Sequence, residues 1–132
     1  TIPNLAQMTS FSMGVLTHML YCELAARVPV IFLDTLHLFP ETLATVQKAK
    51  ELYDLDLHTY RPAADRNEFI AYYGDRLWEK DVVRFHSLTK VKPMERALKE
   101  LDIQAWITGR RRDQSATREH MPILERDVDV RI

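Results

Sequence analysis

Cysteine and glycine are scarce in this chain, and each shortage excludes a kind of site. Cys22 is the only cysteine among 132 residues, which excludes an intrachain disulfide and a cysteine-rich metal site. A reducing compartment is consistent with that count. Only three glycines are present and no Walker-type phosphate loop occurs, which argues against a P-loop nucleotidase.

A strong net charge and a long apolar run are also missing. The formal net charge is -1, so no global field draws the chain to nucleic acid or to a membrane, and any basic function is local. No apolar run approaches the roughly 20 residues that span a bilayer. The opening TIPNLAQMTS lacks the features of a secretory signal, while a removed transit segment stays open. We therefore expect a cytoplasmic protein, with a plastid as the alternative.

Strand-like and helix-like segments alternate along the chain. The run VPVIFLDT is continuously apolar until its final polar residues, as in a strand covered on both faces. The alternation predicts an α/β domain over residues 1–132, with a mostly parallel sheet flanked by helices. The expected strands are 5–11, 28–35, 56–62 and 103–109, and the expected helices are 14–26, 37–55, 64–74 and 92–101.

Three polar segments follow predicted strands: TSFSMG (9–14), LDTLHLFPET (33–42) and TGRRRDQS (108–115). Parallel sheets bind ligands at the carboxyl ends of their strands. We therefore expect the three segments to line one crevice, although they lie far apart in sequence.

The first two segments have both a binding and a structural interpretation. TSFSMG precedes a helix, where free backbone N–H groups suit an anion, but Ser10 or Ser12 could equally cap that helix. Asp34 could accept hydrogen bonds from sugar hydroxyls or an amine, or it could cap the next turn. His37 is a candidate acid–base group or phosphate ligand, against a purely structural role.

The third segment carries the strongest signal. Arg110, Arg111 and Arg112 offer guanidinium groups that match phosphate or sulfate oxygens. Gly109 lets the backbone approach a ligand closely. Neutral donors follow at Gln114 and Ser115. The alternative is a solvated loop in which the arginines pair with Asp113 and Glu119.

Three further residues favour structural roles. Cys22 lies inside a predicted helix, where a cysteine is usually a small buried hydrophobe rather than a nucleophile. Trp78 is expected to anchor a loop, with a lid over the crevice as the alternative. Lys90 could add positive charge to the crevice or lie on the surface.

Four separated segments, FLDTLHLFPETL, YGDRLWEKD, LTKVKPMERALKEL and WITGRRRDQSATR, together resemble the phosphoadenosine phosphosulfate (PAPS) reductase family, in order from about residue 9 to 125. The resemblance implies a Rossmann-like, adenine-nucleotide α-hydrolase-like fold that binds adenosine 3'-phosphate 5'-phosphosulfate. The implied reaction is attack by a cysteine thiolate on the substrate sulfur, followed by release of sulfite by thioredoxin or glutaredoxin. A homodimer is compatible with the family and is not fixed by these residues. The implied substrate-binding residues are Ser10, Phe11, Leu33, Asp34, Thr35, Lys90, Gly109, Arg110, Arg111, Gln114 and Ser115.

The chain departs from the family pattern in four ways. The reactive cysteine belongs to a C-terminal ECG-type tail, and the chain stops at Ile132 before any such tail, so we expect the domain to be incomplete and to hold no catalytic residue itself. No cysteine stands near Phe85 and His86, where cluster-binding relatives have a pair, so we expect no iron–sulfur cluster, no metal and a preference for the 3'-phosphorylated substrate. Lys92 replaces the acid of the family's KVEP segment. The loop TSFSMG is short.

Two alternatives to a reductase remain at this stage. The first is a non-catalytic adenine-nucleotide-binding module that has kept the crevice and lost the nucleophile. The second is an ATP-splitting relative such as an adenylyltransferase, which the absence of an SGGKDS-type loop disfavours.

Overall fold

The computed structural model describes residues 4–9 and 14–126. Four parallel strands form one sheet in the order β3-β2-β1-β4. They are β1 (Leu5–Met8), β2 (Val30–Leu33), β3 (Leu57–Tyr60) and β4 (Ala105–Thr108). The expected α/β class and parallel sheet are confirmed, with each strand shorter than its predicted range.

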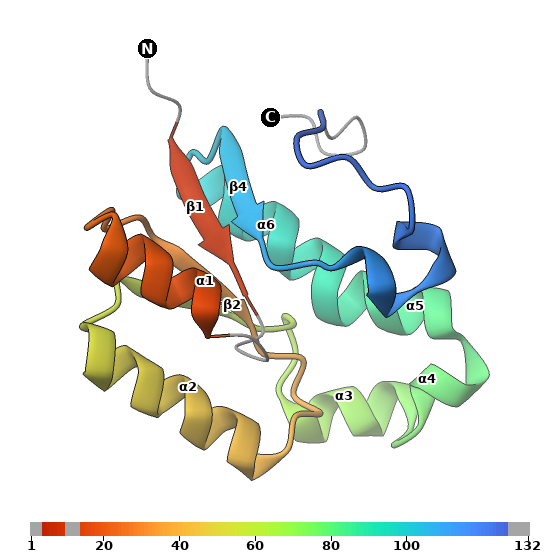
Figure 1. The fold of residues 1–132 in the computed structure, drawn as a ribbon. Coiled ribbons are helices and arrows are strands. Elements are labelled where there is room, and N and C mark those ends of the chain that lie inside the picture. The colour runs from red at the N-terminus through yellow and green to blue at the C-terminus, as the bar shows by residue number, and fades with distance from the viewer. Residues whose placement is uncertain (1–3, 10–13, 127–132) are drawn as a thin grey trace.

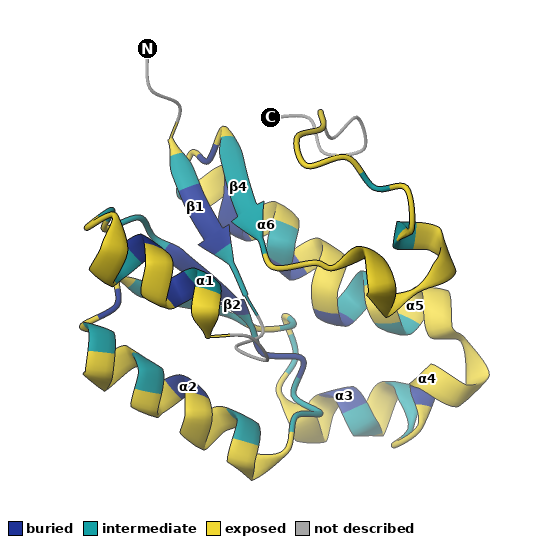
Figure 2. Ribbon diagram, viewed as in Figure 1, coloured by how far each residue is buried: buried dark blue, intermediate teal, exposed yellow. Residues whose placement is uncertain are grey.

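Side chains of β2 alternate between two apolar layers, as the period of two in a strand requires. Val30 and Phe32 pack with the α2 helix (Pro40–Tyr53), whereas Ile31 and Leu33 face α6 (Lys92–Glu100). Burial on both faces explains why this strand reads as an unbroken apolar run. Figure 1 shows α1 and α2 on one side of the strands and α6 on the other, and Figure 2 shows β1 and β2 among the most buried elements.

The first helix is short and then widens. Helix α1 (Val15–His18) continues as a π-helical turn over Met19–Glu23, and its N-cap is Gly14, with no side-chain cap. Cys22 lies in the wider turn and is exposed, so its expected burial was wrong. A π turn adds one residue to the repeat, which rotates the following side chains away from the face that α-helical spacing predicts.

Helices α2 and α3 have the ends that their sequences predict. Pro40 stands in the first turn of α2, where its missing N–H costs nothing. Helix α3 (Arg66–Tyr73) begins with a capping box in which Asp65 and Glu68 each accept the other's backbone N–H. It ends at Gly74, whose φ of 82° is a left-handed conformation that glycine tolerates best.

A helical run over residues 82–91 precedes the predicted helix and was not expected from the sequence. After α4 (Leu77–Lys80), α5 (Val82–His86) and a π turn (Ser87–Val91) lead directly into α6. Asp81 caps α5 by accepting a hydrogen bond from the N–H of Arg84 at 3.0 Å. The wider turn lies just before Pro93, which has no N–H to donate to the helix. Within the described residues, no helix has the length and apolar character needed to cross a bilayer.

Candidate functional site

The turn after β2 is buried and fully paired at its carboxylate. Asp34 is 7% exposed; its Oδ1 accepts a hydrogen bond from the N–H of Leu36 at 2.9 Å, and its Oδ2 lies 3.1 Å from Nε of Arg61. The N–H of Asp34 donates to the carbonyl of Tyr60 at 2.9 Å, which ties the turn to β3. Asp34 therefore caps its own turn, which is the structural one of the two interpretations given from the sequence. Its carboxylate is also held by Arg61, which was not predicted from the sequence.

Arg61 occupies the same kind of position as the predicted site residues, at the carboxyl end of a strand, although it was not among them. It directly follows β3, so it lies at the same edge of the sheet as the turns after β2 and β4. Its side chain is 58% exposed, and of its guanidinium only Nε is committed to Asp34. The carbonyl of Arg61 in turn accepts a hydrogen bond from Nη2 of Arg96 at 2.6 Å, so α6 supports this corner. A groove of about 280 Å³ runs from Asp34 and Arg61 along α2.

The turn residues Leu33 and Thr35 have different environments. Leu33 pairs in register with Tyr60 and packs in the α6 layer. Thr35 is 8% exposed, and its carbonyl lies 2.7 Å from Nδ1 of His37. Leu36 adopts a φ of 67°, so the turn includes a left-handed residue that is not glycine. These contacts give the turn a defined shape.

The loop after β4 is exposed, and its arginines contact acids and carbonyls of the chain itself. Nη2 of Arg110 lies 3.1 Å from Oε1 of Glu125, and Nε of Arg111 lies 3.3 Å from Oδ1 of Asp113. Nε of Arg112 donates to the carbonyl of Met121 at 2.9 Å. The pairing with Asp113 that the structural interpretation predicted is therefore present.

Neutral groups of the same loop bond to each other. Oε1 of Gln114 accepts from the N–H of Arg111 at 3.0 Å and also from Arg118. Oγ of Ser115 lies 3.0 Å from the hydroxyl of Thr117. Because these donors and acceptors are at the surface, water can replace each bond at low cost, and exposed ion pairs are worth at most about 1 kcal/mol. The loop can therefore exchange its internal partners for an anion.

Gly109 connects β4 to this loop next to the first helix. A Cβ added to Gly109 would lie 3.9 Å from Cδ2 of Leu16, which is an ordinary contact, and the residue does not adopt a positive φ. The backbone conformation thus does not by itself require glycine here. The position places the start of the arginine loop beside α1.

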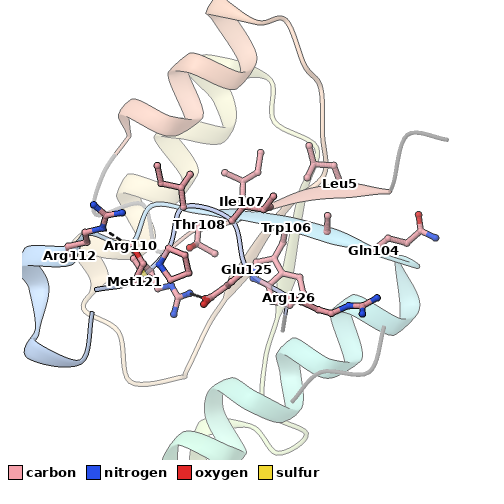
Figure 3. Close-up of a pocket in the computed structure, with 14 residues that line it drawn as sticks. Leu5, Gln104, Trp106, Ile107, Thr108, Arg110, Arg112, Met121, Glu125 and Arg126 are labelled. Atoms are coloured by element: carbon pink, nitrogen blue, oxygen red, sulfur yellow. Dashed lines mark hydrogen bonds and ion pairs between the residues drawn. The ribbon is translucent and has the colours of Figure 1, made fainter. Parts of the chain in front are cut away.

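Arg110 and Arg112 also line an open groove of about 1040 Å³ beside β4. Figure 3 shows β4 residues such as Trp106 and Thr108 along this groove, with Glu125 and Arg126 on the facing segment. The groove does not include Asp34, so the arginine loop and the Asp34 turn line different hollows in this structure.

The two turns nevertheless lie at one edge of the sheet. Strands β2 and β4 flank β1 and run parallel to it, so their carboxyl ends are separated by two strand spacings, roughly 10 Å. A nucleotide is long enough to reach both. Of the other predicted residues, Lys90 is exposed on the π turn before α6, and no polar contact between described residues joins it to either turn. Ser10, Ser12 and Phe11 lie outside the described residues.

Cys22 lies away from this edge. Tyr21, next to Cys22, donates its hydroxyl hydrogen to the carbonyl of Val28, just before β2 begins, which is the opposite end of the strands. Burial raises the pKa of the Tyr21 hydroxyl above its ordinary value of 10. His18 is exposed beside Glu23 at 3.7 Å. Across the described ranges, no group of three or more histidine, cysteine, aspartate or glutamate side chains is arranged to hold a metal ion.

Comparison with known proteins gives a consistent family. The sequence profile of the phosphoadenosine phosphosulfate reductase domain matches residues 5–131. A probable phosphoadenosine phosphosulfate reductase of Schizosaccharomyces pombe is 40% identical over 134 residues, which cover 98% of this chain and 50% of the relative. The phosphoadenosine phosphosulfate reductase of Saccharomyces cerevisiae is 38% identical over 137 residues, covering 96% of this chain and 52% of the relative.

A solved structure agrees with the sequence relatives. The crystal structure of phosphoadenylyl-sulfate reductase from Candida auris, a phosphate complex, superposes with a TM-score of 0.74 at 40% identity. The match covers 83% of this chain and 55% of that one. The chain thus spans about half the length of the relatives it matches. With a match over nearly all of its residues, the chain belongs to the phosphoadenosine phosphosulfate reductase family.

Proposed function

We propose that this chain is the nucleotide-binding part of an enzyme that reduces adenosine 3'-phosphate 5'-phosphosulfate to sulfite and adenosine 3',5'-bisphosphate. The observation that carries the proposal is the placement of two chemically different turns at one sheet edge. A buried carboxylate turn follows β2, and an exposed arginine loop follows β4. A polar, uncharged nucleoside suits the first turn, and phosphate and sulfate groups suit the second.

The proposed reaction assigns separate tasks to this chain and to its reactants. A cysteine thiolate attacks the substrate sulfur, the bond between that sulfur and the phosphate oxygen breaks, and adenosine 3',5'-bisphosphate leaves. The sulfocysteine so formed is resolved by a dithiol of the thioredoxin or glutaredoxin class, which is oxidised as sulfite is released. Negative charge develops on the leaving phosphate, and Arg110 and Arg111 are the groups that would stabilise it. We assign the nucleophile to neither Cys22 nor any other residue of this chain.

The proposed binding residues are divided in the same way between the turn after β2 and the loop after β4. Leu33, Asp34 and Thr35 are proposed to hold the adenosine. Lys90, Gly109, Arg110, Arg111, Gln114 and Ser115 are proposed to surround the phosphates and sulfate, with Ser10 and Phe11 in the first loop. We propose that no metal or iron–sulfur cluster takes part, because the family's cluster cysteines have no counterpart here. The proposed compartment is the cytoplasm.

Calorimetry with adenosine 3',5'-bisphosphate tests the proposal. The protein should bind it, added salt should weaken binding because the contacts are charged, and adenosine alone should bind far more weakly. Arg27→Ala is a matched control, because Arg27 is an exposed arginine paired with Asp54 at 3.5 Å and precedes β2, at the opposite end of the strands from both turns. An intact, folded protein that does not bind the bisphosphate would refute the proposal. Bisphosphate binding without sulfite formation, when thioredoxin is supplied to the full-length protein, would favour a non-catalytic module.

A further inference from the structure

His37 is enclosed by aromatic rings rather than aimed at a ligand. Its ring lies 5.2 Å from that of Phe69, 5.4 Å from Trp78 and 5.1 Å from Phe85, each centroid to centroid and each edge to face. These three rings come from α3, α4 and α5 respectively. The imidazole therefore joins three separate helices to the segment that follows β2.

The hydrogen bond of His37 determines which ring nitrogen carries the proton. Nδ1 lies 2.7 Å from the carbonyl oxygen of Thr35, and a carbonyl oxygen only accepts, so Nδ1 is the protonated nitrogen. Nε2 is buried, with no hydrogen-bond partner among the described residues. A proton on Nε2 would be a buried donor without an acceptor, which is unfavourable. The geometry thus selects the tautomer with its proton on Nδ1.

The segment held by this bond needs support. Leu36 has a φ of 67°, a left-handed conformation that side chains disfavour. Three contacts oppose relaxation of the turn: the Leu36 N–H to Asp34, Arg61 to Asp34, and His37 to the carbonyl of Thr35. Of these, only the His37 bond reaches from the turn to the aromatic rings of α3–α5.

We propose that His37 is a positioning residue that fixes the Asp34–Leu36 turn in its ligand-binding shape through its Nδ1–H. Since Nε2 is closed off from solvent, His37 does not contact the nucleotide and is not a phosphate ligand or an acid–base group. Trp78, which is 40% exposed, closes the ring of aromatics on the outer side; it packs from helix α4 and not from the loop that its sequence context predicted. The ligand in this inference is that of the proposed function, on which the inference rests.

Three substitutions separate the hydrogen bond from the packing. In His37→Asn, the side-chain amide can donate from the position of Nδ1. In His37→Gln, the donor lies farther out, at the position of Nε2, and in His37→Phe an aromatic ring remains without a donor. We expect the affinity for adenosine 3',5'-bisphosphate to fall about fivefold to tenfold in the Gln and Phe variants and to stay within about twofold in the Asn variant. Equal losses in all three, or no loss in any, would overturn the proposal.

If the wild-type protein binds no bisphosphate, that result refutes the proposed function alone. The positioning role of His37 is then tested by two measurements without ligand. The ¹⁵N shifts of the His37 ring should show a protonated Nδ1 and a bare Nε2 at neutral pH. Hydrogen exchange of the Leu36 amide should be slow in the wild type and in His37→Asn, and faster in His37→Phe. A ring protonated on Nε2, or a Leu36 amide whose exchange is indifferent to residue 37, would contradict the positioning role.

Discussion

The turn after β2 and the loop after β4 both present polar groups at the carboxyl ends of the strands, but the turn is buried and the loop is exposed. The Asp34 turn is buried, and it is held by a backbone bond to β3 and by His37, which packs among aromatic rings of α3, α4 and α5. The arginine loop is exposed, and its charges are satisfied by nearby acids such as Glu125 and Asp113. Figure 2 shows the contrast as buried colours after β2 and exposed colours after β4.

This difference indicates how recognition is divided. A preformed buried turn is already ordered when the chain has folded, so it can discriminate between ligands by their shape. A self-paired exposed loop can exchange weak internal ion pairs for stronger bonds to an anion. Substitutions in the first region should therefore affect stability as well as affinity, and substitutions in the second should affect affinity with little change in stability.

The largest expected effect on stability is that of Asp34→Ala. The change removes the acceptor of the Leu36 N–H and the partner of Arg61, within a buried turn. We expect the free energy of unfolding in urea to fall by about 2 kcal/mol. The matched control is Asp113→Ala, an exposed aspartate paired with Arg111, which should change it by less than about 0.5 kcal/mol. Similar losses in both variants would erase the contrast between the two regions.

Arg110→Ala should have the reverse profile. Its side chain is 46% exposed and pairs at the surface with Glu125, so the free energy of unfolding should stay within about 0.5 kcal/mol of the wild-type value. The affinity for adenosine 3',5'-bisphosphate should fall about tenfold in calorimetry, because a charge-assisted bond to phosphate is lost. Arg27→Ala, at the opposite end of the strands, should leave that affinity unchanged. A destabilised Arg110→Ala protein with normal affinity would reverse our assignment.

Glu125→Gln should increase the affinity for the bisphosphate, in contrast to the loss expected for Arg110→Ala. The change removes the acid that neutralises Arg110 while keeping its size. We expect bisphosphate binding to become about twofold to fivefold tighter at low ionic strength, and this gain to shrink as salt is added. Weaker binding would mean that the ion pair orients Arg110 for the ligand rather than competing with it.

The smallest expected effect concerns Tyr60, at the end of β3. Burial, followed by the hydrogen bond to Glu100 at 2.8 Å, raises the pKa of its hydroxyl above 10. A raised pKa means that the folded state holds its proton more tightly, so this stabilisation is complete below pH 10 and is lost as pH rises through the folded-state value. Tyr60→Phe should therefore reduce the slope of stability against pH above 10, measured by urea unfolding. An unchanged slope would show that Tyr60 does not contribute.

Much of this arrangement could be predicted from the sequence, because burial on both faces produces the continuous apolar run of β2 and the turns that follow strands carry distinct chemistry. The parallel sheet and the existence of α2 and α3 followed from such patterns. Arg61 was missed although it occupies the same kind of position, because a single arginine after a strand gives no local pattern that distinguishes it from a surface residue.

Other features depend on tertiary packing. The helical run over 82–91 begins with two β-branched valines, which disfavour a helix locally, and it forms as an extension of α6. The exposure of Cys22 follows from a π turn that no spacing rule predicted. Gln7 is fully buried in β1 and bonds to Thr17 at 2.8 Å, and its polar character gave no indication of that partner ten residues away. The aromatic enclosure of His37 likewise needs three helices brought together by the fold.

The central claim is that both turns act on one anionic adenosine ligand, and an NMR titration with adenosine 3',5'-bisphosphate tests it most directly. The account predicts that the amides of Thr35 and Leu36 and those of Arg110 and Arg111 shift together and yield a single dissociation constant. Shifts confined to one of the two turns, or two distinct dissociation constants, would contradict it.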